Sequence, residues 1–146
     1  MNDRDERVLS GDISGGRHHM AVRVYYEDTD FSGVVYHPNY LKFFERAREH
    51  ALGQQKLVWL WETHQLGFVV YQLDMKFNEG ARFADLLDIR SSYNLTGTFR
   101  MNWQQEAWRP DATKAAVTAT IQLVCINHQR QLQPIPLQLL DLPPQS

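Results

Sequence analysis

Residues 22–51 read VRVYYEDTDFSGVVYHPNYLKFFERAREHA, and they predict a strand, an acidic turn and a long helix in direct succession. Val22, Val24 and Tyr26 alternate with more polar neighbours, which is the period-two pattern of a half-buried strand. The alternation stops at residues 28–33, where short polar side chains and a glycine favour a turn.

The helix is expected to begin at Pro38, because proline is favoured at the first helical position, with His37 as the cap. The first backbone N–H groups of a helix have no partner within it, so Asn39 and Tyr40 would present donors and an electropositive end. One apolar face follows at helical spacing: Tyr40, Phe43, Phe44, Ala47 and Ala51. We therefore expect this helix to form the axis of the domain.

Asp28 and Asp30 stand shortly before this electropositive helix start. A carboxylate in that position can attack a carbonyl carbon or activate water while the backbone donors stabilise an oxyanion. Aspartates in this pattern also shape turns through bonds to the nearby backbone. Spacing alone leaves both interpretations open.

The motif DTDFSGVVYHPNYL at residues 28–41, followed by FFERAR at residues 43–48, resembles the signature of the 4-hydroxybenzoyl-CoA thioesterase family of hotdog proteins. It is most similar to the branch of acyl-CoA thioesterases associated with the Tol-Pal system. The motif covers about thirty residues, and a weaker similarity of layout continues to about residue 126. The resemblance implies an α+β hotdog fold, in which a curved five-stranded antiparallel sheet wraps a long central helix.

The resemblance also implies roles for individual residues. The second aspartate of the motif is the catalytic carboxylate, which places that role on Asp30. Tyr26 and His37 match positions that line the active site, and the backbone N–H of His37 would polarise the thioester carbonyl. We expect further contacts with the substrate from six residues: Gly33, Val34, Tyr36, Asn39, Arg82 and Arg100.

The expected reaction is hydrolysis of an acyl-CoA thioester to a free carboxylic acid and CoA. Asp30 would act either as the nucleophile or as the general base that deprotonates water. Glu45 on the central helix is a competing carboxylate, but ion pairs with Lys42 and Arg48 explain it better. Two alternatives stay open: a thioesterase acting on acyl carrier protein, and a non-catalytic module that binds an acyl thioester or a protein.

One departure from the family concerns the phosphates of CoA. Aryl-CoA members carry basic residues at the hairpin between the middle strands, whereas residues 94–98 here read NLTGT. The CoA phosphates would then be held by Arg82, Arg100 or Arg109, or the substrate would be carried by a carrier protein.

Length and charge narrow the function classes. With 146 residues and a net charge of −2, we expect one domain at residues 20–142, between a flexible tail at 1–19 and a tail at 143–146. That charge predicts no nucleic-acid partner. Neither a membrane span nor a signal peptide is recognisable, so we expect a cytoplasmic protein.

Metal and cofactor motifs are missing from the sequence, and we expect neither a metal nor a cofactor. Adjacent His18 and His19 are poorly spaced for one metal ion. The lone Cys125 in an apolar strand is expected to be buried and not a nucleophile.

The later sequence predicts a short helix near residues 57–61, followed by strands. Trp59 and Trp61 on that helix would either line an acyl or aryl pocket or simply fill the core. Four strands are expected, the first covered on both faces at one end: residues 67–77, 86–95, 99–108 and 115–127. An open sheet has two edges that can pair with another copy, and the resemblance implies a homodimer that assembles to a homotetramer with active sites at the subunit interface.

Overall fold

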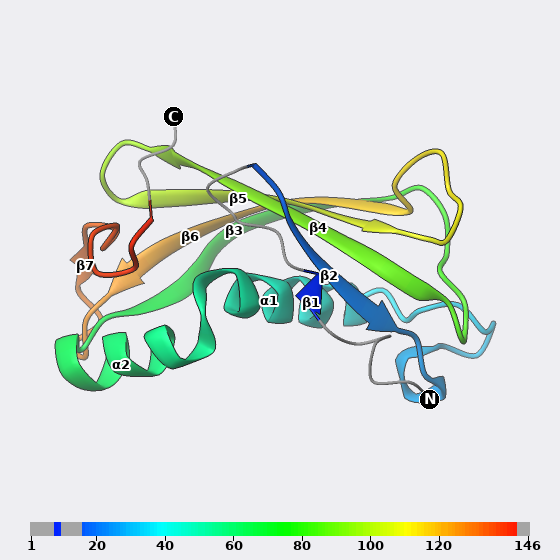
Figure 1. Cartoon of the computed structure of the whole chain (residues 1–146), viewed down its shortest axis with the longest axis horizontal. Helices are drawn as coiled ribbons and strands as arrows, with labels where there is room; N and C mark the ends of the chain where they lie inside the picture. The colour runs from blue at the N-terminus through cyan, green and yellow to red at the C-terminus, as the bar shows by residue number, and fades with distance from the viewer. Residues whose placement is uncertain (1–7, 10–15, 143–146) are drawn as a thin grey trace.

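A computed structural model describes residues 8–9 and 16–142 of the chain, and within them an antiparallel sheet covers one long helix (Figure 1). The strands are β1 (Val8–Leu9), β2 (His18–Arg23), β3 (Gly67–Phe77), β4 (Leu86–Thr96), β5 (Arg100–Trp108), β6 (Val117–Ile126) and β7 (Leu132–Gln133). The helices are α1 (Asn39–Leu52) and α2 (Gln54–His64), besides a 3-10 turn, η3 (Tyr26–Asp28). The strands lie in the order β1-β2-β4-β5-β6-β3, with β7 on β6. The hotdog prediction is confirmed, although the sheet has seven strands instead of five because β1 and β7 add two residues each.

Helix α1 begins one residue later than expected, because Pro38 is the residue that caps it. The predicted apolar face packs beneath the sheet, and Tyr40, Phe43, Phe44 and Ala47 are at most 2% exposed. Gly53, with a φ of 96°, ends α1 and lets the chain turn directly into α2. The central helix of the prediction is therefore present, with the expected face buried.

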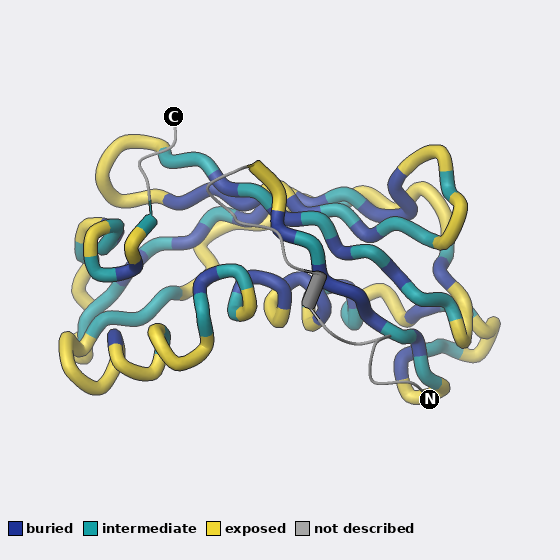
Figure 2. The backbone as a smooth tube through the Cα atoms, viewed as in Figure 1, coloured by how far each residue is buried: buried dark blue, intermediate teal, exposed yellow. Residues whose placement is uncertain are grey.

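Alternate residues of β4, β5 and β6 face α1 and form much of the core, which gives the banded pattern of burial in Figure 2. Ile89, Trp103 and Ile121, on three neighbouring strands, are between 0% and 1% exposed. The turn predicted at residues 96–98 joins β4 to β5, and Gly97 takes the positive φ of 63° that it needs. Local alternation thus predicted both the strands and the face that they bury.

The first strand differs from the prediction at both ends. β2 starts at His18, inside the stretch predicted as a tail, and pairs with β4 through His19 opposite Arg90. It ends at Arg23, and Tyr26 starts η3 because the Asp28 carboxylate accepts the Tyr25 N–H at 2.9 Å. The rest of the predicted tails, residues 1–7, 10–15 and 143–146, lies outside the described residues.

β3 was predicted to be covered on both faces at one end, and this is wrong. It pairs only with β6 and forms an edge of the sheet. Its apolar side chains are open to solvent, with exposed fractions between 39% and 57% for Val69, Val70, Tyr71, Leu73 and Phe77. An apolar run is also what an edge strand shows when another molecule covers it.

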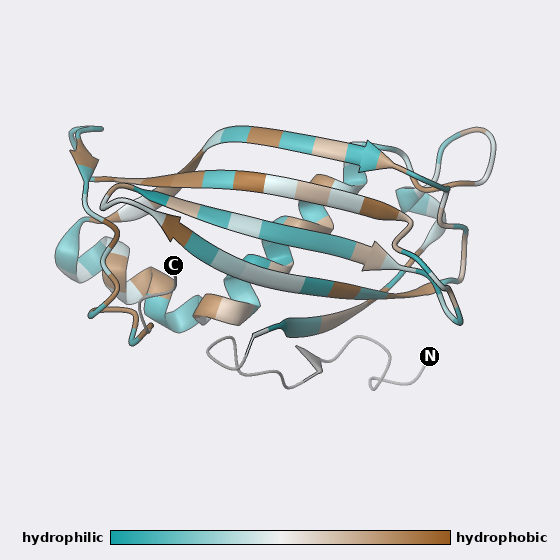
Figure 3. Cartoon of the chain, turned by 90° about the horizontal axis from the view of Figure 1, so that it is seen from above, coloured by the Kyte–Doolittle hydropathy of each residue, from teal (hydrophilic) through white to brown (hydrophobic). Residues whose placement is uncertain are grey.

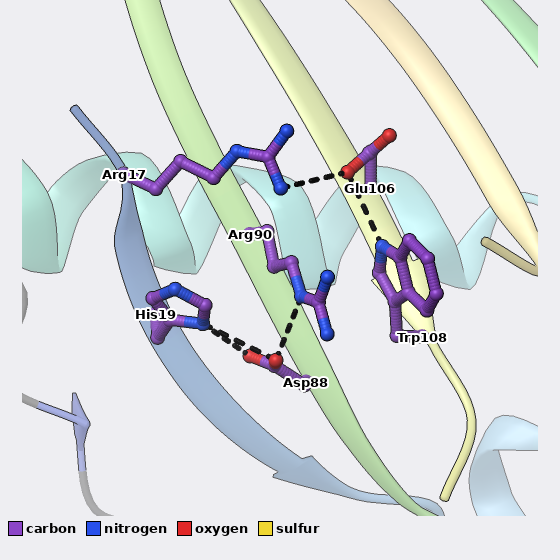
Figure 4. A network of polar contacts seen from close by, with 6 residues as sticks. All are labelled: Arg17, His19, Asp88, Arg90, Glu106 and Trp108. Carbon is purple, nitrogen blue, oxygen red and sulfur yellow. Dashed lines mark hydrogen bonds and ion pairs between the residues drawn. The ribbon is translucent and has the colours of Figure 1, made fainter. Parts of the chain in front are cut away.

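Hydrophilic and hydrophobic residues form bands along the strands (Figure 3), and polar side chains of β2, β4 and β5 contact one another across the sheet (Figure 4). His19 Nδ1 lies 2.9 Å from a carboxylate oxygen of Asp88, and Arg90 Nε donates to Asp88 at 2.9 Å. The Arg90 guanidinium lies 4.0 Å from the centre of the Trp108 ring. These contacts pair the charge of Asp88 with His19 and Arg90 within the sheet itself.

His18 begins β2 and is only 3% exposed. Its Nδ1 atom has no hydrogen-bond partner within the described part of the chain. Burial lowers the pKa of His18, and the nearby His50 and His19 lower it further. The folded chain therefore favours the neutral form of this imidazole.

We expect this group to make stability depend on pH. The unfolded chain binds a proton at His18 near its ordinary pKa of about 6.5, whereas the folded chain does so only at lower pH. The stabilisation is complete above about pH 6.5 and is lost as the pH falls below that value, with a slope of at most about 1.4 kcal/mol per pH unit. His18→Phe should show a smaller fall in the free energy of unfolding between about pH 7 and pH 5, measured by urea denaturation. Equal slopes in the two proteins would contradict this role.

Candidate active site

The acidic turn is held in place by Asp28. Its Oδ2 accepts the Tyr25 N–H at 2.9 Å, and its Oδ1 accepts the side-chain amide of Asn39 at 3.0 Å. Its carbonyl oxygen accepts the Tyr36 N–H at 2.8 Å. Asp28 is 9% exposed, so it joins the end of β2 to the start of α1 and is not available to a substrate. Asn39, predicted to contact the substrate, has its amide engaged in the same support.

Asp30 projects from the other side of the same turn. Its Oδ1 accepts the Ser32 N–H at 2.8 Å and the Ser32 hydroxyl at 2.7 Å. These bonds, the hydroxyl first, lower the pKa of Asp30 and keep its carboxylate ionised. The backbone N–H groups of Val34 and Gly33 also lower this pKa. The Asp30 side chain is only partly buried, so a substrate can reach its carboxylate.

A cavity of about 330 Å³ lies beside Asp30. Val34 from the turn, His37 and Tyr40 from the start of α1, and Phe77 from the end of β3 line it. The His37 ring stands edge-on to Phe77, with ring centres 6.3 Å apart. The structure thus brings three of the predicted residues together: Asp30, Val34 and His37.

The backbone N–H of His37 has no hydrogen-bond acceptor within the part of the chain that the structure describes. By contrast, the next N–H, that of Asn39, donates to the Tyr36 carbonyl at 2.8 Å. His37 directly precedes Pro38, which has no N–H of its own and caps the helix. The donor of His37 therefore lies at the positive end of the α1 dipole and beside the Asp30 cavity.

The turn after β3 forms the opposite wall of the cavity. The sequence predicted this turn but not its place in the site. Asn78, Glu79 and Gly80 line the cavity there. The Tyr40 hydroxyl accepts the Ala81 N–H at 3.1 Å, and the Val35 N–H donates to the Ala81 carbonyl at 2.8 Å. No local pattern indicates this contact, because the two turns lie more than forty residues apart in the chain.

Several predicted residues lie away from the cavity. Tyr26 is 76% exposed and stacks on Phe83, with ring centres 4.0 Å apart. Tyr36 is half-exposed and contacts the His37 ring from outside, and Gly33 is exposed at the tip of the turn. The structure therefore does not place Tyr26 beside Asp30.

The arginines considered for the CoA phosphates differ in their surroundings. Arg109 donates to Asp85 at 2.8 Å and lies 3.8 Å from Glu79, and the Asp85 bond raises its pKa. The Arg100 guanidinium lies 4.9 Å from the centre of the Tyr71 ring. The Arg82 side chain is exposed, and its backbone pairs with Val34. Of the three, Arg82 lies next to the turn that carries Asp30.

Other candidate groups give no second site. Cys125 is fully buried, and burial raises the pKa of its thiol to about 11. Within the described residues, no group of three or more His, Cys, Asp or Glu side chains could hold a metal ion. No helix in that part of the chain is long and apolar enough to cross a membrane.

Comparison with known proteins gives the family. The model of the thioesterase-like superfamily matches residues 24–142. The chain belongs to this superfamily. The match begins just before the acidic turn and includes both walls of the Asp30 cavity.

Relatives of this thioesterase-like chain include the acyl-CoA thioesterase YbgC of Haemophilus influenzae, which is 39% identical over 111 residues. That alignment covers 73% of this chain and 78% of the relative. The acyl-CoA thioester hydrolase YbgC of Escherichia coli is 43% identical over 75 residues, which cover 48% of this chain and 53% of the relative.

Among solved structures, a probable thioesterase from Bartonella henselae is similar, with a TM-score of 0.77 and 32% identity. That comparison covers 83% of this chain and 100% of the other. A 1,4-dihydroxy-2-naphthoyl-CoA thioesterase from Synechocystis has a TM-score of 0.76 at 22% identity, covering 86% of this chain and 93% of the other, and shows the fold alone.

Gly80 keeps the two walls of the cavity close together. A Cβ atom at Gly80 would lie 2.8 Å from Val34 Cγ1, which is closer than carbon atoms approach. Gly80→Ala should therefore push the two turns apart, lower the free energy of unfolding by about 1–3 kcal/mol and reduce any activity at Asp30. The double variant Gly80→Ala/Val34→Ala removes the Cγ1 contact but keeps Val34 Cβ, 3.0 Å from the added atom, so it should regain part of the lost stability, as measured by urea denaturation. Additive losses in the double variant would show that this contact is not the cause.

Proposed function

We propose that this chain is an acyl-CoA thioesterase, which hydrolyses a thioester to a free carboxylic acid and CoA. The observation that carries the proposal is the pairing of an ionised Asp30 with the unpaired His37 N–H beside one cavity. The YbgC relatives are named acyl-CoA thioesterases or thioester hydrolases, which supports the same chemistry.

In the proposed reaction the thioester carbonyl oxygen accepts the His37 N–H, and the α1 dipole stabilises the negative charge that develops there. Asp30 then acts in one of two ways. As a nucleophile it displaces the CoA thiolate and forms a mixed anhydride, which water cleaves to the acid. As a general base it takes a proton from the water that attacks the carbonyl carbon. Tyr26 has no step in either route, because it stacks away from the cavity.

The recognition of CoA is proposed to involve Arg82, since its exposed side chain is next to Val34 and the Asp30 turn. Arg109 is already paired with Asp85, and Arg100 lies against Tyr71, so neither is a free phosphate ligand in this arrangement. This scarcity of cations favours a second candidate, a thioester presented by acyl carrier protein, which lacks the adenine nucleotide.

The open edge of β3 supports a homodimer. Five apolar side chains of this strand are exposed, and its outer backbone groups can pair with an antiparallel copy. We propose that two chains join their sheets through β3. Assembly of two such dimers to a homotetramer, and localisation in the cytoplasm, remain predictions from the sequence.

Asp30→Asn should keep the fold and lower kcat/KM for acyl-CoA hydrolysis by about 100- to 10,000-fold, because the amide neither attacks nor accepts a proton. Thiol release from acetyl-, hexanoyl-, palmitoyl- and benzoyl-CoA measures this. The control is Asp111→Asn, the same change at an exposed turn position outside both the cavity and β3. Near-normal turnover by Asp30→Asn would refute the mechanism. If the wild type hydrolyses acyl thioesters of acyl carrier protein but none of the CoA esters, the second candidate is selected.

The Ser32 hydroxyl is expected to set the acidic limit of activity. Because its hydrogen bond lowers the pKa of Asp30, Ser32→Ala should raise that pKa. Activity requires the ionised carboxylate, so the acidic limb of the kcat/KM profile should move to higher pH. Ser32→Thr keeps a hydroxyl and should retain the wild-type limb. A profile that does not move in Ser32→Ala would remove Asp30 as the titrating group.

A further inference from the structure

A second cavity, of about 430 Å³, lies at the other end of α1. It is enclosed by apolar side chains from α1, α2 and β3, including Leu52, Leu57, Leu60, Trp61, Phe68 and Val70. Val69 and Val70 line it as well as the open edge of β3, where they are 39% and 48% exposed. The cavity therefore continues to the edge at which we propose that a second copy pairs.

Trp61 forms one wall of this cavity, which we call the Arg48 cavity because Arg48 is the cationic residue in its lining. Its ring lies so close to Gly67 that a Cβ atom there would be 3.0 Å from it. It also packs on the His128 ring, with centres 4.1 Å apart. Trp59 on the same helix contacts His64 instead and does not line the cavity. Of the two predicted roles, Trp61 shows the lining of a cavity, whereas Trp59 is 41% exposed and shows neither.

Arg48 is the unusual member of the lining, because it is charged and only 8% exposed. Its Nη1 donates to the Gln105 side-chain oxygen at 3.0 Å, a neutral acceptor. No carboxylate lies within ion-pair distance of it in the described part of the chain. A guanidinium has five N–H donors, and a buried one without a carboxylate needs further acceptors.

The carboxylates near Arg48 define which acceptor suits the cavity. Glu45 and Glu49 line it as well, on the same helix, and they favour the charged form of Arg48 through space. They would repel a ligand carboxylate entering beside them. A neutral oxygen, such as a hydroxyl or keto group, accepts from the guanidinium without that repulsion.

In the proposed dimer, the Arg48 cavity of one subunit lies close to Asp30 of the other. The two cavities border α1 near Tyr40 and near Arg48, eight residues or about 12 Å apart along the helix. Antiparallel pairing through β3 sets the Gly67 end of one copy beside the Phe77 end of the other. The Arg48 cavity of one subunit then lies next to the Asp30 cavity of its partner.

We propose that the Arg48 cavity binds the acyl group of a thioester held at Asp30 of the partner subunit, and that Arg48 donates a hydrogen bond to a hydroxyl or keto oxygen at the far end of that acyl group. This inference rests on the proposed function and names its substrate class as oxygenated acyl chains.

The first test concerns the cavity wall. Trp61→Ala should lower the ratio of kcat/KM for decanoyl-CoA to that for acetyl-CoA by at least about tenfold, because only the longer chain reaches the cavity. Trp59→Ala, a matched change on the same helix, should keep the wild-type ratio. An unchanged ratio in Trp61→Ala overturns the inference while acetyl-CoA hydrolysis still supports the thioesterase. Loss of all hydrolysis in the wild type overturns the function itself.

The second test concerns the oxygen. Wild type should prefer ω-hydroxyoctanoyl-CoA to octanoyl-CoA by about tenfold in kcat/KM, the effect of one good hydrogen bond. Arg48→Met keeps the apolar stem and should abolish that preference. Arg48→Lys retains a cation with donors and serves as the second variant if the methionine variant fails to fold; it should weaken the preference. The same preference in either folded variant overturns the role of Arg48.

The third test asks which subunit supplies the cavity. Heterodimers of an Asp30→Asn chain and a Leu57→Trp chain, isolated through two different tags, combine one intact Asp30 with the intact cavity of the other chain. They should hydrolyse decanoyl-CoA at up to about half the wild-type rate, whereas each homodimer should not. An inactive heterodimer, or a chain that light scattering shows to be a monomer, overturns the arrangement between subunits.

Discussion

The Asp28 carboxylate is the constraint on which the rest of the site depends. By accepting the Tyr25 N–H it ends the strand, and by accepting the Asn39 amide it fixes the first turn of α1. These two bonds tie together the ends of the segment between Tyr25 and Asn39, and Asp30 and His37 both lie within it. A buried carboxylate that accepts two hydrogen bonds is costly to replace. Asp28 therefore has a structural role, whereas Asp30 lines the cavity.

A second polar device docks α1 against the sheet. Gln105 is fully buried on β5 and donates to the Phe44 carbonyl and to the Ser91 hydroxyl, both at 2.9 Å, while it accepts from Arg48. The side-chain oxygen and nitrogen of Gln105 therefore both have partners within this cluster. Apolar packing between a helix and a sheet permits sliding, whereas this network permits one register. The register sets where the two ends of α1, and therefore the two cavities, lie against β3.

Sequence reasoning succeeded where the determining interactions are local. The helical spacing of Tyr40 to Ala47, the alternation of β4 to β6 and the turn at Gly97 each depend on residues close together in the chain, and each is confirmed. Sequence reasoning failed where contacts between segments far apart in the chain determine the structure. Gly80 meets Val34 only after the sheet forms, and the apolar run of β3 has the same composition whether a strand is buried in its own fold or at an edge. Tyr26 left the predicted strand because one side-chain hydrogen bond, to a residue outside the alternating pattern, outweighed its propensity.

The donors that keep Asp30 charged bear on the proposed function, in which a substrate and a second subunit cover this carboxylate. In the single chain this carboxylate is open to water, and covering it with a substrate and a second subunit removes water and raises its pKa. The donors that lower the pKa are the hydroxyl and N–H of Ser32, two residues away in the same turn, and they move with Asp30. A stabilising charge on a distant element would instead depend on how the subunits meet. In the proposed function, these local donors would therefore favour the ionised carboxylate both before and after the cavity is covered, as a nucleophile or general base there requires.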